Sequence, residues 1–115
     1  MSSVLLAEDE FLIRAVLVDA LSDIGLACIE APTGQAALDV VTGTTPLAAI
    51  IVDIGLPDMS GEKVIEAAVQ HRPGTPIIRC SGAGGGTATP GVHIFPKPYS
   101  ATELSKFVAS LIARG

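Results

Sequence analysis

Five polar residues of this sequence have the side chains needed to bind a cation and a phosphoryl group. They are three carboxylates, one hydroxyl and one amine: Glu8, Asp9, Asp53, Ser81 and Lys97. Carboxylates held close together repel one another, and a hard divalent cation such as Mg²⁺ relieves that repulsion through oxygen ligands. In such a set Asp53 would be a carboxylate nucleophile that forms an acyl phosphate, while Lys97 and Ser81 would contact the phosphoryl oxygens.

Asp53 follows the longest apolar run of high strand propensity, residues 47–52, and precedes a stretch of turn residues, 54–61. An apolar run closed by Gly and Pro is typical of a strand buried on both faces. Open α/β sheets bind their ligands at the carboxyl ends of their strands. The alternative is that Asp53 only ends its strand as a turn former.

Strands and helices alternate along the whole chain, which predicts an α/β fold with a doubly wound, mostly parallel sheet and helices on both faces. Thr33, Ser60 and Ser100 are expected to cap the second, third and last helices. Strands are expected over residues 4–7, 27–31, 47–52, 76–80 and 92–95, and helices over 11–24, 33–41, 60–72 and from 100 onward.

Each candidate residue comes at the end of its own expected strand. Glu8 and Asp9 follow the first strand, Asp53 the third, Ser81 the fourth and Lys97 the fifth. Because the carboxyl ends of parallel strands lie along one edge of a sheet, all five side chains are expected to converge on one patch.

Composition limits the classes of protein that fit. The chain has 115 residues, enough for one domain over 1–115, and 49% hydrophobic against 17% charged residues excludes disorder. A net charge of -5 argues against nucleic-acid binding. No leader or membrane-length apolar stretch is apparent, and Cys28 and Cys80 are expected to be buried thiols in a reducing compartment. The expected location is the cytoplasm.

Taken together, these residues resemble those of a response-regulator receiver domain of two-component signalling, over essentially the whole chain. The resemblance implies a chemotaxis-regulator-like, flavodoxin-like fold with strand order 2-1-3-4-5. Its matching pieces are the acidic pair Glu8-Asp9, Asp53 with Pro57 and Gly61 after it, Ser81, and Lys97-Pro98.

The resemblance also implies a role for each residue of the site. Asp53 would accept a phosphoryl group from a phosphohistidine of a sensor histidine kinase or a histidine phosphotransfer protein. Ser81 would move towards that group and Lys97 would pair with it, which would switch a surface that binds a downstream protein partner. Mg²⁺ would be held by Asp9, Asp53 and the backbone carbonyl of Gly55, with Glu8 acting directly or through water, and the Lys97-Pro98 peptide would be cis.

The sequence departs from the family pattern at three places. Glu8 stands where an Asp is more usual, and its longer side chain still reaches a cation. Ile94 stands where the family usually carries a switching aromatic, and Phe95 is the expected partial substitute. Residues 82–91 hold five glycines and a proline, which predicts that the family's fourth helix is missing or much reduced, because both residue types destabilise helices.

The first helix carries more apolar positions than one core stripe requires. Ile13 and Val16, with Pro98, are therefore a candidate docking surface for the kinase, and core packing is the alternative. Loss of the fourth helix slightly favours a monomer.

Other functions are left open. A phosphorylation-independent binding module on the same fold is the main alternative. The glycine stretch could be a phosphate-binding loop for a nucleotide, but it is not followed by the Gly-Lys-Ser/Thr of such loops. A hydrolase with an external substrate would need a second carboxylate near Asp53 as its general acid or base. Gly55, two residues after Asp53, supplies no such carboxylate. The expected activity is thus confined to phosphotransfer onto Asp53 and its reversal by autodephosphorylation, so the protein is not expected to be an enzyme with an external substrate.

Overall fold

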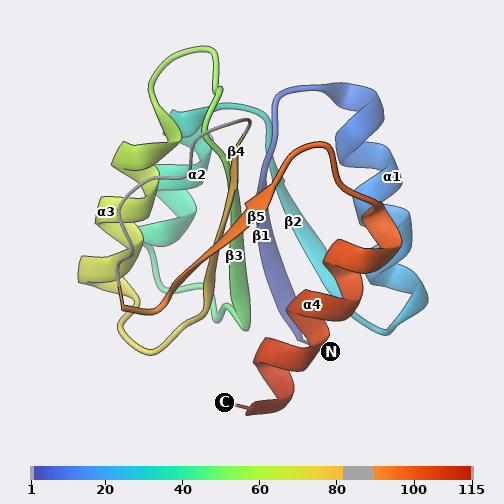
Figure 1. Ribbon diagram of the computed structural model, residues 1–115. Coiled ribbons are helices and arrows are strands. Elements are labelled where there is room, and N and C mark those ends of the chain that lie inside the picture. Colours follow the sequence, from blue (N-terminus) through green and yellow to red (C-terminus); the bar gives the residue numbers. More distant parts are fainter. Residues whose placement is uncertain (1, 82–89, 115) are drawn as a thin grey trace.

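The computed structural model describes residues 2–81 and 90–114. They form three layers, a central sheet with helices on each of its two faces (Figure 1). Five parallel strands lie in the order β2-β1-β3-β4-β5. Helices α1 and α4 cover one face, and α2 and α3 cover the other (Figure 1). The predicted flavodoxin-like fold and its strand order are therefore confirmed.

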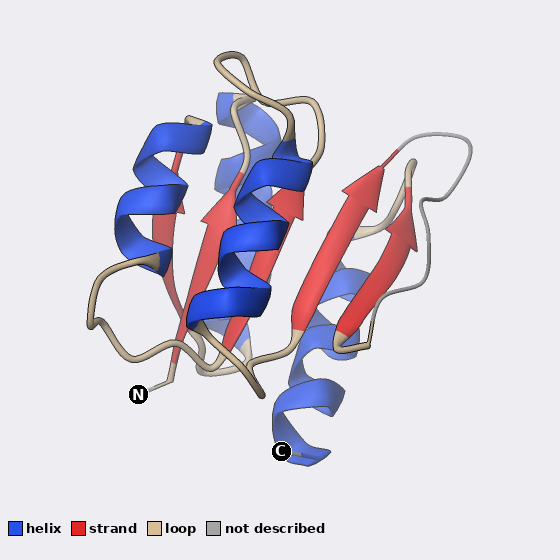
Figure 2. Ribbon diagram, turned by 90° about the vertical axis from the view of Figure 1, so that its left-hand side faces the viewer, coloured by secondary structure: helices blue, strands red, loops and turns tan. Residues whose placement is uncertain are grey.

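The elements follow the predicted alternation of strand and helix. The strands are β1 Ser3–Ala7, β2 Ala27–Ala31, β3 Ala49–Asp53, β4 Ile77–Ser81 and β5 Val92–Pro96. The described helices are α1 Phe11–Asp23, α2 Gly34–Val41, α3 Gly61–His71 and α4 Ala101–Arg114. Figure 2 shows all five strands running in the same direction, so that their carboxyl ends share one edge.

The core consists of two apolar layers, one on each face of the sheet. Successive residues of a strand point to opposite faces, so Leu6 of β1 packs with α1 and α4 while Leu5 packs with α2 and α3. The middle strand β3 is buried at all five positions, as its apolar sequence predicts. Asp53 thus ends a strand that is fixed on both sides.

The predicted helix caps are all present. The side-chain oxygens of Thr33, Ser60 and Ser100 accept hydrogen bonds from backbone N–H groups of their helices at 3.1, 3.2 and 3.3 Å. The limits of β2 are as predicted, and those of the other strands differ by one or two residues from the predicted ones. The middle strand pairs with β1 only from Ala49 onward, and Asp53 and Ser81 are the last residues of their strands rather than the first residues after them.

The prediction of a missing fourth helix concerns residues 82–91. Residues 82–89 lie outside the described part of the chain, and Pro90 and Gly91 form a turn before β5. Between β4 and β5, no helix is present among the residues that the structure describes. Within 2–81 and 90–114, no helix combines the length and apolarity needed to cross a bilayer.

Two contacts fix the loop that follows Asp53. A Cβ on Gly61 would lie 2.5 Å from the Asp53 carbonyl oxygen, so only glycine lets α3 begin against the end of β3. The carboxylate of Asp58 accepts hydrogen bonds from the N–H groups of Gly34 and Gln35 at 2.7 and 2.9 Å. These bonds lower the pKa of Asp58 and join the loop to the first turn of α2.

Candidate functional site

The five residues singled out in the sequence lie along the carboxyl edge of the sheet. Glu8 and Asp9 follow β1, Asp53 ends β3, Ser81 ends β4 and Lys97 follows β5. The neighbouring strands β1, β3 and β4 are paired in register, which brings their ends side by side. This edge is where open α/β folds bind ligands.

Three of these residues form an acidic cluster. One carboxylate oxygen from each of Glu8, Asp9 and Asp53 lies within 4.8 Å of the others. Glu8 is 1% exposed and Asp53 is 7% exposed, so water screens their mutual repulsion poorly. The cluster needs a positive charge nearby.

Lys97 supplies one positive charge. Its Nζ donates a hydrogen bond to Oδ1 of Asp53 at 2.8 Å, and the N–H of Gly55 donates to the same oxygen at 3.4 Å. Desolvation lowers the pKa of Lys97, but the hydrogen bond and charge of Asp53 and the charge of Glu8 more than offset it, so its pKa lies above the usual value. Lys97 therefore remains a cation at neutral pH.

The environment of Glu8 indicates that the site binds a cation in addition to Lys97. Its Oε2 accepts a hydrogen bond from the N–H of Glu10 at 3.1 Å, whereas Oε1 is buried without a partner among the described residues. Burial raises the pKa of Glu8 to about 7, with a further contribution from the charge of Asp53, while the Glu10 bond acts in the opposite direction. A buried carboxylate oxygen without a partner is costly, and a bound ligand removes that cost.

The donor set fits Mg²⁺, which prefers carboxylate and carbonyl oxygens. Glu8, Asp9 and Asp53 would hold the ion, with the backbone carbonyl of Gly55 as the expected fourth ligand. The orphaned Oε1 of Glu8 is the observation that supports this assignment.

Ser81 has a partner that the sequence analysis missed. Its Oγ accepts a hydrogen bond from Nη1 of Arg79 at 2.8 Å, and Nε of Arg79 lies 2.6 Å from Oε1 of Glu62 in α3. The signal in the sequence was Arg79 itself, a charged residue inside the otherwise apolar stretch 76–80, which indicates a buried partner. The N–H of Lys97 also donates to the Ser81 carbonyl at 2.8 Å, and the Lys97-Pro98 peptide is cis, as predicted.

The two residues near the position of the family's switching aromatic lie on opposite faces of the sheet. Ile94 pairs with Arg79 across β4 and β5 and is 38% exposed. Phe95 packs on the other face, with its ring 5.8 Å from Tyr99 and 5.4 Å from Phe107. The prediction that Phe95 partly substitutes for the aromatic is therefore wrong, because alternate residues of a strand face opposite sides.

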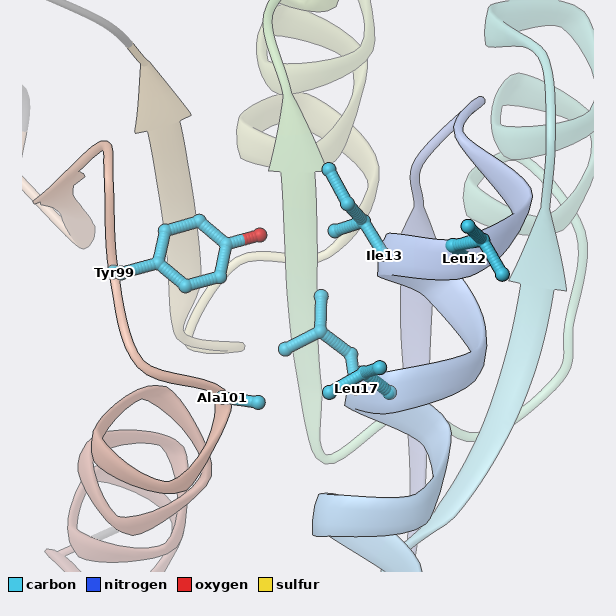
Figure 3. A pocket seen from close by; sticks show the side chains of 6 residues that line it. Leu12, Ile13, Leu17, Tyr99 and Ala101 are labelled. Atoms are coloured by element: carbon cyan, nitrogen blue, oxygen red, sulfur yellow. The ribbon is translucent and has the colours of Figure 1, made fainter.

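The predicted docking residues border one apolar surface next to the site. Ile13 and Val16 line a pocket between α1 and the start of α4, opposite Tyr99 (Figure 3). A second pocket contains Ile13 and Pro98 together with Lys97, so the surface reaches the acidic site. Val16 is 57% exposed, which excludes core packing for this residue, whereas Ile13 is partly buried against the core.

Comparisons with known proteins agree with this arrangement. The response regulator receiver domain family matches residues 4–108. The chain therefore belongs to the response regulator receiver domain family. A response regulator receiver protein from Sinorhizobium medicae superposes with a TM-score of 0.88 at 23% identity, over 97% of this chain and 94% of that one. A CheY-like receiver domain protein from Methanospirillum hungatei gives 0.85 at 22% identity, over 99% and 95%.

One curated relative is similar in sequence over a shorter stretch. It is the DNA-binding transcriptional regulator NtrC of Klebsiella pneumoniae, 34% identical over 73 residues. The match covers 64% of this chain but only 15% of NtrC.

The raised pKa of Glu8 predicts how stability depends on pH. Without metal, folded Glu8 holds its proton up to about pH 7, whereas in the unfolded chain it loses the proton near its ordinary pKa of 4.5. The free energy of unfolding should therefore fall as pH rises from about 4.5 to about 7, by up to about 3 kcal/mol. Urea denaturation of wild type and Glu8→Gln in EDTA measures this, and the variant should lack that part of the decrease. An equal decrease in both proteins would contradict the assignment.

Proposed function

We propose that this receiver domain accepts a phosphoryl group on Asp53 from a phosphohistidine of a sensor histidine kinase or a histidine phosphotransfer protein. The observation that carries the proposal is the position of Asp53. It ends a buried strand, belongs to the acidic cluster and accepts a hydrogen bond from Lys97 at 2.8 Å. No other described acidic cluster meets a lysine in this way.

In the proposed step, a carboxylate oxygen of Asp53 bonds to phosphorus while the bond from phosphorus to the donor nitrogen breaks and the imidazole leaves. Lys97 pairs with the carboxylate before the reaction and with the phosphoryl oxygens after it. Mg²⁺, when bound by Glu8, Asp9, Asp53 and the Gly55 carbonyl, supplies positive charge to the same oxygens. Ser81 then donates a hydrogen bond to the phosphoryl group.

We infer that the chemistry is limited to Asp53 itself. Phosphotransfer onto Asp53 and its later hydrolysis need no external substrate, so the protein is not proposed to be an enzyme in the usual sense. The change at Ser81 would alter a surface that binds a downstream protein. A monomer in the cytoplasm stays a prediction, as does the absence of nucleic-acid and membrane binding.

The main alternative, a binding module that works without phosphorylation, keeps the fold but gives the site no role. The buried, unpartnered oxygen of Glu8 favours a site that holds an ion. A surface with no such function would gain stability by losing that carboxylate.

Intact-mass measurement after incubation with acetyl phosphate tests the proposed function. Wild type should gain one phosphoryl group when Mg²⁺ is present, and Asp53→Asn should gain none. Asp39→Asn, which changes an exposed aspartate of α2, should react like wild type. An unmodified wild type that is folded and contains Mg²⁺ would favour the phosphorylation-independent alternative.

We further propose that the histidine-containing partner docks on the surface formed by Ile13, Val16 and Pro98. Leu12, which lines the same pocket as Ile13 and Val16, is 75% exposed, and exposed apolar side chains gathered at one place are typical of a protein interface. The second pocket joins this surface to Lys97, so a docked partner could bring its phosphohistidine to Asp53.

The substitution Val16→Asp tests the docking surface. Phosphotransfer from a phosphorylated histidine phosphotransfer protein should slow by at least about tenfold, since a buried unpaired charge costs more than 1.4 kcal/mol. Phosphorylation by acetyl phosphate, which needs no docking, should be unchanged. Val69→Asp, at a 39% exposed position of α3, should leave both rates at the wild-type value. Equal transfer to Val16→Asp and wild type would exclude this surface.

A further inference from the structure

Arg79 is an unusual residue for its position. It lies in β4, which pairs with β3 on one side and β5 on the other, and its side chain is only 12% exposed. The neighbouring residues of the strand, Ile78 and Cys80, are buried in the core on the opposite face. A charge in such a strand is expensive to desolvate unless it is paired.

The guanidinium of Arg79 joins two parts of the molecule. Its Nη1 donates to the Oγ of Ser81 at 2.8 Å, and its Nε donates to Oε1 of Glu62 at 2.6 Å. Glu62 lies in the first turn of α3 and its side chain is 54% exposed. An ion pair with one exposed partner adds little stability, so stability alone gives Arg79 little reason to be there.

The hydrogen bond from Arg79 constrains the Ser81 hydroxyl. A serine oxygen has one O–H donor and two acceptor lone pairs, and Arg79 occupies one of the lone pairs. The O–H is therefore directed away from Arg79 and remains available as a donor. A cationic donor also strengthens the bonds that the same hydroxyl makes.

Ser81 ends β4, the strand next to β3, which Asp53 ends. Asp53 pairs with Cys80 across β3 and β4, so Ser81 is the next residue along that strand. On the other side, Arg79 pairs with Ile94, whose side chain has no hydrogen-bonding group. On this face of the sheet, Arg79 links Ser81 to Glu62 of α3.

We propose that Arg79 is a positioning residue that acts on the phosphoryl group through Ser81. It holds the Ser81 hydroxyl so that the O–H points to a phosphoryl oxygen on Asp53, and Glu62 holds Arg79 in turn. This inference rests on the proposed phosphorylation of Asp53.

A double-mutant cycle on the rate of phosphorylation by acetyl phosphate tests the inference. Ser81→Ala is expected to slow the reaction about 100-fold, the lower end of the effect that loss of one preorganised donor has in other sites. Arg79→Met, which keeps an unbranched apolar side chain but removes the guanidinium, should slow it to a similar extent. In the Ser81→Ala background, Arg79→Met should cause no further loss, because Arg79 acts only through Ser81.

Further variants separate positioning from a general structural role. Arg79→Lys keeps the charge but cannot contact both partners, and should restore part of the rate. Glu62→Gln should slow the reaction of the wild-type background and leave that of Ser81→Ala unchanged. Glu66→Gln, at an exposed position one turn further along α3, should have no effect in either background. Should Arg79→Met not fold, the Glu62→Gln cycle decides the question alone.

The outcomes distinguish this inference from the function on which it rests. A wild type that takes up no phosphoryl group overturns both. A wild type that reacts normally, with Arg79→Met equally fast, overturns the inference alone. The same holds if Arg79→Met is slow to the same degree with and without the Ser81 hydroxyl, since a structural effect adds independently.

Discussion

Two buried carboxylates, Glu8 and Asp53, lie close to each other and to Asp9, and their mutual repulsion is the constraint on which this site depends. Lys97 balances part of the charge through its 2.8 Å bond to Asp53. Burial, with a smaller contribution from the charge of Asp53, raises the pKa of Glu8 to about 7, and its Oε1 has no partner among the described residues. Such a site binds a proton at low pH, and is suited to bind a cation at higher pH.

The fold holds these charges together at a cost that the rest of the structure offsets. The β3 strand is buried along its whole length, so Asp53 has little freedom to move away from the cluster. Gly61 lets α3 begin against the backbone of Asp53, and Asp58 joins the intervening loop to α2. The bond from the N–H of Lys97 to the Ser81 carbonyl joins the ends of β4 and β5. Strand ends and the start of a helix thus carry the site, and the apolar surface formed by Ile13, Val16 and Pro98 lies beside it.

Features set by local sequence were predictable, and features set by side-chain packing were not. The position of Asp53 followed from the apolar run before it, and the cap at Thr33 followed from local hydrogen-bonding chemistry. The pairing of Arg79 with Ser81 and Glu62 depends on side-chain orientations across two elements, which no local pattern encodes. The face of Phe95 was predictable, because adjacent residues of a strand point to opposite sides and Phe95 follows Ile94 directly. The expectation that Phe95 replaces the aromatic came from the family resemblance and did not take this alternation into account.

A crystal structure of the protein with Mg²⁺ and beryllofluoride, a stable analogue of a phosphoryl group, tests the central claim most directly. We expect beryllium to be bonded to a carboxylate oxygen of Asp53, with Nζ of Lys97 and Oγ of Ser81 on fluorine atoms. One metal ion is expected among Glu8, Asp9 and Asp53. Beryllofluoride bound at another residue, or a metal ion outside this cluster, would contradict the account.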